Sequence, residues 1–322
     1  MESFNSLNSK SFLESIKDPR KFKQFLKNNQ PNSFVESKDL VQIRVSIQRK
    51  QNIYLMQNKQ KELLQWGTFV FITIFVFLFF SSGDFSFILT LSSLVQTFGF
   101  VLLVWKVFRS RSISGLSRNT LVCYFVCILS RLFSIMRYEG YLPYDATGDF
   151  VYRITEIITF VCCCILLYFS FVLYKATYNW DIDTFQWYYF VIPSFLLALC
   201  IHPSLNLRFY ADVAWTFGLY LESFAMFPQL DVFRKKGGEI ESYTSHYVAS
   251  QTLSRIMQFI FWVFSFKELN ETINSSSFFP SYVGFFVLIA QIIQIALTGD
   301  FLYFYITSIK QGIPLTLPSY VI

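Results

Sequence analysis

Charged residues are scarce in this sequence, and histidines are scarcer still. Charged side chains make up 15% of the 322 residues, whereas hydrophobic residues account for 53% and aromatic residues for 20%. A soluble domain of this length has too little interior to bury so large an apolar fraction, so the composition indicates a polytopic membrane protein. The two histidines, His202 and His246, have no acidic partner or ligand spacing nearby. We therefore expect no catalytic centre, no metal site and no cofactor.

The cysteines lack the paired spacings of a metal site or a disulfide framework. All six fall in apolar stretches, where we interpret them as small core residues: Cys123, Cys127, Cys162, Cys163, Cys164 and Cys200. Walker, Rossmann and zinc motifs are also missing, so the sequence favours neither an enzyme nor a nucleic-acid-binding protein.

Long apolar windows are what the chain has in plenty. Windows of about 18 to 25 mostly apolar residues are long enough to cross a bilayer. Eight of them are present, starting near Gln65, Ser86, Ser117, Phe150, Thr184, Asn206, His246 and Phe278.

The positive charge lies mainly on one side of these spans. Residues 1–66 hold 12 Lys or Arg against 6 Asp or Glu, whereas residues 67–322 hold 15 of each. If the loops alternate, 21 of the 27 basic residues share the side of the N-terminus. The opposite side receives Arg137, Arg208 and Lys267, and Arg131, Arg153 and Arg255 fall inside the membrane. This bias predicts that both termini face the cytosol, or the matrix of a mitochondrion.

The first 65 residues form a basic polar arm without the apolar stretch of a signal peptide. Within it, "VQIRVSIQ" alternates apolar and polar residues, with Val41, Ile43, Val45 and Ile47 on one face. This period is typical of a half-buried strand, and a lone strand is unstable. We expect strand addition to the sheet of a partner subunit, or else a helical or disordered stretch. Other membrane subunits and lipid are thus the partners that the arm predicts.

One apolar stretch, "AWTFGLYLESFAMFPQL", carries a carboxylate at its centre. A charged side chain in such a stretch is costly, so Glu222 needs a partner or a function. We expect it to pair with a tyrosine or with Arg255 as part of an internal polar network.

Separated blocks of the sequence carry a family resemblance. In this order they resemble the endoplasmic-reticulum (ER) lumen protein-retaining receptors, or KDEL receptors: "VWKVFRSRSISGLSRNT" (Val104–Thr120), "KATYNWDIDTF" (Lys175–Phe185), "WTFGLYLESFAMFPQL" (Trp215–Leu230), "TSHY" (Thr244–Tyr247) and "GDFLYFYIT" (Gly299–Thr307).

The resemblance implies an all-α membrane fold of seven spans, similar to SWEET and PQ-loop transporters. In such a fold two three-helix bundles are joined by a linking helix, and a binding cavity lies between them. Pro228-Gln229 matches the PQ element. The implied organisation is an arm (1–65), an extra transmembrane helix (66–82), the receptor-like domain (85–318) and a short tail (319–322).

The family binds the C-terminal tetrapeptide of escaped luminal proteins at acidic pH and releases it at neutral pH. Arginines hold the ligand carboxylates, acids hold its basic residue, and a histidine supplies the pH switch. By resemblance, the family's ligand-pocket positions are retained at Arg131, Asp212, Trp215, Glu222, Arg255 and Asp300.

Other pocket positions have lost their charge or hydrogen-bonding group. The family histidine is Gln96, which does not titrate, and the pocket asparagine is Phe261. Each lost charge-assisted contact would weaken binding by about 1.5 to 3 kcal/mol. The full set of lost positions is Leu89, Gln96, Ser134, Ser254, Gln258, Phe261 and Ser265.

These departures lead to one main hypothesis and two rivals. The main hypothesis is a non-catalytic accessory subunit of a large membrane complex, such as a respiratory complex of the mitochondrial inner membrane. The first rival is a working receptor for a divergent C-terminal peptide, cycling between Golgi and ER, in which Arg131 still holds a carboxylate. The second is a small-solute transporter, which Phe261 in the cavity argues against. Acceptor triplets at Asn270 and Asn274 would report exposure to the ER lumen if they are glycosylated.

Overall fold

The computed structural model describes residues 64–270, 282–311 and 315–317 of the chain. The chain divides into two compact units, Met1–Thr68 and Phe69–Ile322. Nearly all of the first unit lies outside the described residues, and so do the strand predicted at 41–48 and the acceptor Asn274. The fold that follows is that of the second unit.

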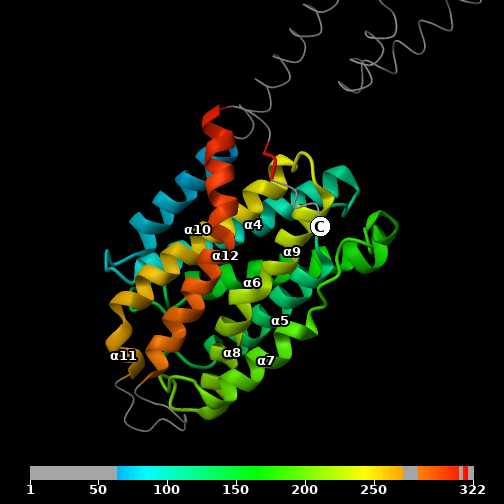
Figure 1. Ribbon diagram of the computed structural model, residues 1–322. Helices are drawn as coiled ribbons and strands as arrows, with labels where there is room; N and C mark the ends of the chain where they lie inside the picture. Colours follow the sequence, from blue (N-terminus) through cyan, green and yellow to red (C-terminus); the bar gives the residue numbers. More distant parts are fainter. Residues whose placement is uncertain (1–63, 271–281, 312–314, 318–322) are drawn as a thin grey trace, which may run out of the picture. The chain divides into compact units, whose positions relative to one another are not determined.

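The described residues are mainly helical, as the sequence predicted. The sole extended pairing among them is an isolated bridge between Glu239 and Thr316. A first apolar helix, Leu64–Phe80, is followed by α4 (Phe87–Ser110), α5 (Arg118–Ile135), α6 (Val151–Tyr168), α7 (Tyr188–Cys200), α8 (Phe209–Ala225), α9 (Phe227–Lys236), α10 (Ser242–Phe264), α11 (Phe266–Asn270) and α12 (Val283–Gln311) (Figure 1).

The helices account for the eight predicted apolar windows. Among the described residues, four are long and apolar enough to cross a membrane: α4, α5, α6 with its π-helical extension to Leu173, and α12. Leu64–Phe80 and α7 are shorter apolar helices. In α8 and α10 most side chains are buried by other helices, and these two carry Glu222 and Arg255. The protein is therefore an integral membrane protein whose polar residues face its interior.

The helices form two similar three-helix bundles. In the first bundle α6 packs against α4 and α5, and in the second α12 packs against α8 and α10. The bundles meet along α4–α10 and α5–α8, and Figure 1 shows α12 running along the second bundle. This is the double bundle that the resemblance implied.

The extra N-terminal helix has a counterpart inside the fold. The linking helix α7 precedes α8 and packs against it. The helix Leu64–Phe80 precedes α4 and contacts it through two ring pairs, Phe69 with Phe98 at 4.6 Å between centroids and Phe77 with Phe87 at 5.0 Å. In the sequence, each bundle is thus preceded by a helix that packs against the first helix of that bundle.

Two local features fix how the bundles meet. Gln229, in the first turn of α9, accepts a hydrogen bond from the Ser117 N–H at 2.8 Å and donates to the Gly115 carbonyl at 2.9 Å. The PQ element therefore holds the turn between α4 and α5. A Cβ added at Gly218 would lie 3.0 Å from the Cys127 carbonyl oxygen, so glycine lets α8 approach α5 closely.

Candidate functional site

Four buried charged side chains meet where the two bundles join. Arg131 comes from α5, Glu156 from α6, Glu222 from α8 and Arg255 from α10. Each is at most 3% exposed. Charged groups in such a position persist only when they are paired and hydrogen-bonded. We call these four residues the charge cluster.

Ion pairs join all four members of the cluster. Arg131 pairs with Glu222 through Nη2, and its Nη1 lies 3.3 Å from Oε1 of Glu156. Arg255 Nη2 lies 2.6 Å from Oε1 of Glu222, which confirms the predicted pairing of this carboxylate with Arg255. Two arginines and two glutamates give a cluster with no net charge.

Glu156 is the member that sequence reasoning did not single out. Its Oε1 accepts a hydrogen bond from Ser93 at 3.0 Å, and Ser93 also bonds to Thr155 at 2.7 Å. The signal was available, because Glu156 stands in the apolar stretch "ITEIITFVCCCILL" just as Glu222 does in its own. A carboxylate inside a predicted span indicates a buried partner wherever it occurs.

The positions that differ from the family surround the cluster with neutral groups. Gln96 donates to Glu222 at 3.1 Å, and Gln258 accepts from Arg255 at 2.6 Å and from Gln291 at 3.3 Å. Two serines bind other groups: Ser254 bonds to Ser92 at 3.0 Å, and Ser134 accepts from Asn206 at 3.0 Å.

The remaining altered positions add no charge. Leu89 is buried in the first turn of α4, and Ser265 caps the C-terminus of α10. Neither of the two histidines belongs to the charge cluster. His202 is in the connection between α7 and α8, where burial lowers its pKa. The cluster itself therefore contains no group whose ordinary pKa lies near neutrality.

An aromatic layer lies between the charge cluster and the end of the bundles formed by the α5–α6 and α7–α8 connections. Trp215 stacks on Tyr141 with 3.9 Å between ring centroids and an interplanar angle of 5°. Trp262 meets Trp215 edge-on at 5.0 Å and Phe261 at 4.9 Å. All four side chains are buried. Phe85, in the connection before α4, stacks on Phe261 from outside at 6.4 Å.

Asp212 holds this aromatic layer in place. Its carboxylate accepts hydrogen bonds from the Tyr141 hydroxyl at 2.7 Å and from the backbone N–H groups of Asn206 at 3.0 Å and Arg208 at 3.1 Å. Burial and this carboxylate raise the pKa of Tyr141, so the phenol stays protonated and donates. Asp212 thus stabilises the start of α8, and no arginine side chain is among its hydrogen-bond partners in the described residues.

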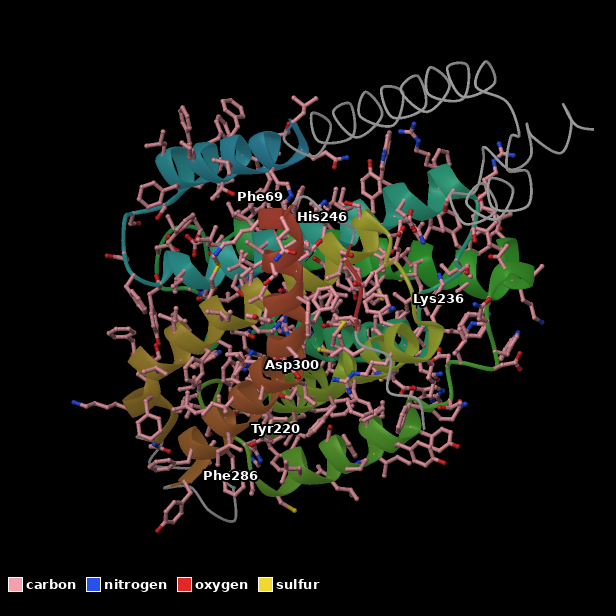
Figure 2. All side chains as sticks on the ribbon, turned by 45° about the horizontal axis from the view of Figure 1, so that its top comes forward. Phe69, Tyr220, Lys236, His246, Phe286 and Asp300 are labelled. Atoms are coloured by element: carbon pink, nitrogen blue, oxygen red, sulfur yellow. The ribbon has the colours of Figure 1, made fainter. Side chains whose placement is uncertain are left out.

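Asp300 lies away from the other predicted site residues. It is exposed on α12 and shares a small surface pocket with Arg234 and Phe304 (Figure 2). It stands about 25 Å along α12 from Val283, because an α-helix rises 1.5 Å per residue. Ser265, which the resemblance places in the same pocket, caps the far end of α10. A motif match assigns a residue to a helix but does not fix its position along the helix axis relative to the neighbouring helices. The sequence therefore placed Asp300 and Ser265 in one pocket.

The two arginines of the charge cluster are ion-paired within the protein and are not open to a ligand. In the described part of the chain both Arg131 and Arg255 already face carboxylates, and the aromatic layer separates them from the nearest bundle end. The chemistry available is therefore structural ion pairing among four helices.

Comparisons with known proteins agree with the architecture. The family profile described as "ER lumen protein retaining receptor" matches residues 112–265. A Caenorhabditis briggsae protein named ER lumen protein-retaining receptor is 30% identical over 221 residues, which cover 69% of this chain and 93% of that protein. The Drosophila melanogaster protein of that name is 29% identical over 70% of this chain and 96% of its own length. Human ER lumen protein-retaining receptor 2 is 28% identical over 68% and 92%.

Proposed function

The chain belongs to the ER lumen protein-retaining receptor family, and we propose that it no longer captures C-terminal peptides and serves as a non-catalytic structural subunit of a membrane complex. The observation that carries the proposal is the pairing of Arg131 with both Glu156 and Glu222. The resemblance assigns this arginine to the ligand carboxylate, and here two internal carboxylates hold it.

The charge balance of the cluster argues against the capture of a peptide carboxylate. A peptide carboxylate that reaches Arg131 must displace Glu156 or Glu222. Glu156 would then be a buried charge with no cation facing it in the described residues, and Glu222 would keep Arg255 alone. Leaving one partner of a buried ion pair unpaired costs about 3 to 5 kcal/mol. The incoming carboxylate regains about 1.5 to 3 kcal/mol for each charge-assisted hydrogen bond, so the exchange yields little net affinity.

Access argues in the same direction. A ligand approaching from the end at the α5–α6 connection must separate the face-to-face contact of Tyr141 and Trp215 and pass Phe261. Ser81 and Ser86 bind Asp145, in the α5–α6 connection, at 2.8 and 3.0 Å. The connection that follows the extra helix is therefore tied across this end.

The structural role rests on what the chain has besides the family domain. We expect contact with other subunits through the basic arm and the helix Leu64–Phe80, and the neutral, ion-paired charge cluster supplies rigidity without a ligand. For the compartment, the mitochondrial inner membrane remains our hypothesis from the sequence, and the family names favour the ER and Golgi.

Complexome profiling of gently solubilised membranes tests the structural role and the compartment together. Stoichiometric co-migration of this chain with one large assembly is the expected result, and the other members of that assembly would name the organelle. Migration as a small species together with ER and Golgi markers would contradict the proposal.

One specific observation favours a second candidate, a working receptor for a divergent signal. Arg131, Trp215, Glu222 and Arg255 all lie around one interior region, as a binding pocket requires. Under this alternative, a C-terminal peptide would bind and Arg131→Gln would abolish its binding.

A further inference from the structure

An apolar groove lies on the outer side of the second bundle, away from the charge cluster. It measures about 380 Å³ and lies between α7 and α12, with α8 as its floor. Tyr220 of α8 and Phe286 of α12, both labelled in Figure 2, line it. Its volume falls within the range of about 300 to 1,000 Å³ that small-molecule sites have.

The lining excludes charged ligand groups. Its residues are aromatic or aliphatic apart from one serine, and none of them carries a charge. A phosphate or ammonium headgroup would have no counter-charge there, and burying it would cost several kcal/mol. The part of a ligand that lies in the groove must therefore be neutral.

Two polar points in the groove lie on α7. Pro193 has no N–H, so the carbonyl of Tyr189 lacks the donor that an α-helix normally provides. Among the described residues, none hydrogen-bonds to the hydroxyl of Ser194, although the residue is buried and lines the groove. An acceptor and a hydroxyl one to two turns apart match a ligand with one alcohol group.

The positions of these points give the ligand a direction. Tyr189 is in the first turn of α7, beside the half-exposed Trp187 and Tyr188, which are the residue types that mark a membrane interface. Leu197 and Phe286 lie further along the groove, away from this end. A molecule with its hydroxyl near Tyr189 and a flat apolar body along the aromatic lining would match both ends of the groove.

We infer that the groove between α7, α8 and α12 binds a sterol, with its hydroxyl at Tyr189 and Ser194 and its ring system against Tyr220 and Phe286. The site is separate from the charge cluster, so it does not depend on whether a C-terminal peptide binds.

Photo-labelling of the full chain in lipid vesicles tests this inference. The probe is a cholesterol analogue that carries a diazirine on the ring system and an alkyne for detection. We expect label on peptides that contain residues 189–197 and 286–293, and we expect unlabelled cholesterol to reduce it. Label elsewhere, or equal competition by phosphatidylcholine or diacylglycerol, would overturn the inference.

Two adjacent leucines provide a matched pair of variants. Leu197 lines the groove, whereas Leu196 does not and is 57% exposed on the same helix. Leu197→Trp is expected to reduce labelling at least tenfold by filling the groove, and Leu196→Trp is expected to leave it unchanged. Equal labelling of both variants would contradict the site.

The polar contact has its own variant. Ser194→Ala removes one neutral hydrogen bond, so the concentration of probe needed for half-maximal labelling should rise about fivefold. An unchanged labelling curve would exclude Ser194 from the assigned site. Thermal unfolding of each variant confirms that the helices are intact before labelling is compared.

Discussion

The guanidinium of Arg131 is paired with the carboxylate of Glu222 across the contact between α5 and α8, and both side chains are almost completely buried. Because α5 belongs to the first bundle and α8 to the second, this pair joins the two halves of the protein. Glu156 and Arg255 extend it to α6 and α10. A position that the family resemblance assigns to ligand binding is thus part of the internal framework.

Neutralising Glu222 should destabilise the protein strongly. Glu222→Gln leaves Arg131 with Glu156 alone and leaves Arg255 with no carboxylate partner among the described residues, and breaking a buried pair costs about 3 to 5 kcal/mol. We expect a clear fall in the midpoint of thermal unfolding in detergent, followed by intrinsic fluorescence.

The control for this variant is Glu139→Gln. Glu139 is 79% exposed and pairs with Arg153 at 3.4 Å, and exposed pairs contribute about 0 to 1 kcal/mol. If the two variants unfold at the same temperature, the charge cluster does not hold the bundles together.

The close approach of α5 and α8 should depend on Gly218. A methyl group there would press against the carbonyl oxygen of Cys127, which is backbone and does not move easily. Gly218→Ala should therefore lower the unfolding midpoint. Gly299→Ala in α12 meets nothing within 4 Å and gains helix propensity of up to about 1 kcal/mol, so its midpoint should stay or rise.

The aromatic layer should contribute to stability through Phe261. Removing a buried phenylalanine side chain costs about 3 to 5 kcal/mol, so Phe261→Ala should unfold at a lower temperature. Phe264, on the same helix, is 72% exposed and serves as the matched position. Equal effects of Phe261→Ala and Phe264→Ala would show that the layer is not packed as described.

Asn270 should carry no glycan in the folded protein. Its Oδ1 accepts a hydrogen bond from the Gly284 N–H at 2.9 Å, which ties α11 to the start of α12. A sugar on this amide would disrupt that contact. Mass spectrometry of the intact chain and of peptides containing Asn270 should find it unmodified, and a glycan at this residue would contradict the placement of α11.

Much of the fold follows from the sequence because hydrophobic spans and family motifs are local signals. The eight apolar windows correspond to eight of the ten α-helices in the described residues, and the Pro228-Gln229 element holds the α4–α5 turn. A partner for Glu222 was also predicted, a tyrosine or Arg255, because a carboxylate in an apolar span needs one, and the structure has Arg255.

The site residues that the sequence misplaced or missed depend on how the helices are positioned along their axes relative to one another. Asp300 was grouped with the pocket by its motif, but its place along α12 puts it beside Arg234 instead. Glu156 was not predicted because it is not one of the pocket positions that the family resemblance implies. Its role appears only when α6 is placed against α5, so that its carboxylate reaches Arg131.

The central claim is that Arg131 serves the framework and binds no peptide, and equilibrium binding of a labelled Lys-Asp-Glu-Leu peptide with a free C-terminus tests it most directly. Purified full-length protein would be titrated at a pH of about 5.5 and again at about 7.5, because the family's switch would act between these values. We predict no saturable binding at either pH up to about 100 µM peptide, a limit that corresponds to roughly 5.5 kcal/mol. Micromolar binding that is lost in a folded Arg131→Gln variant would contradict the account and favour a working receptor.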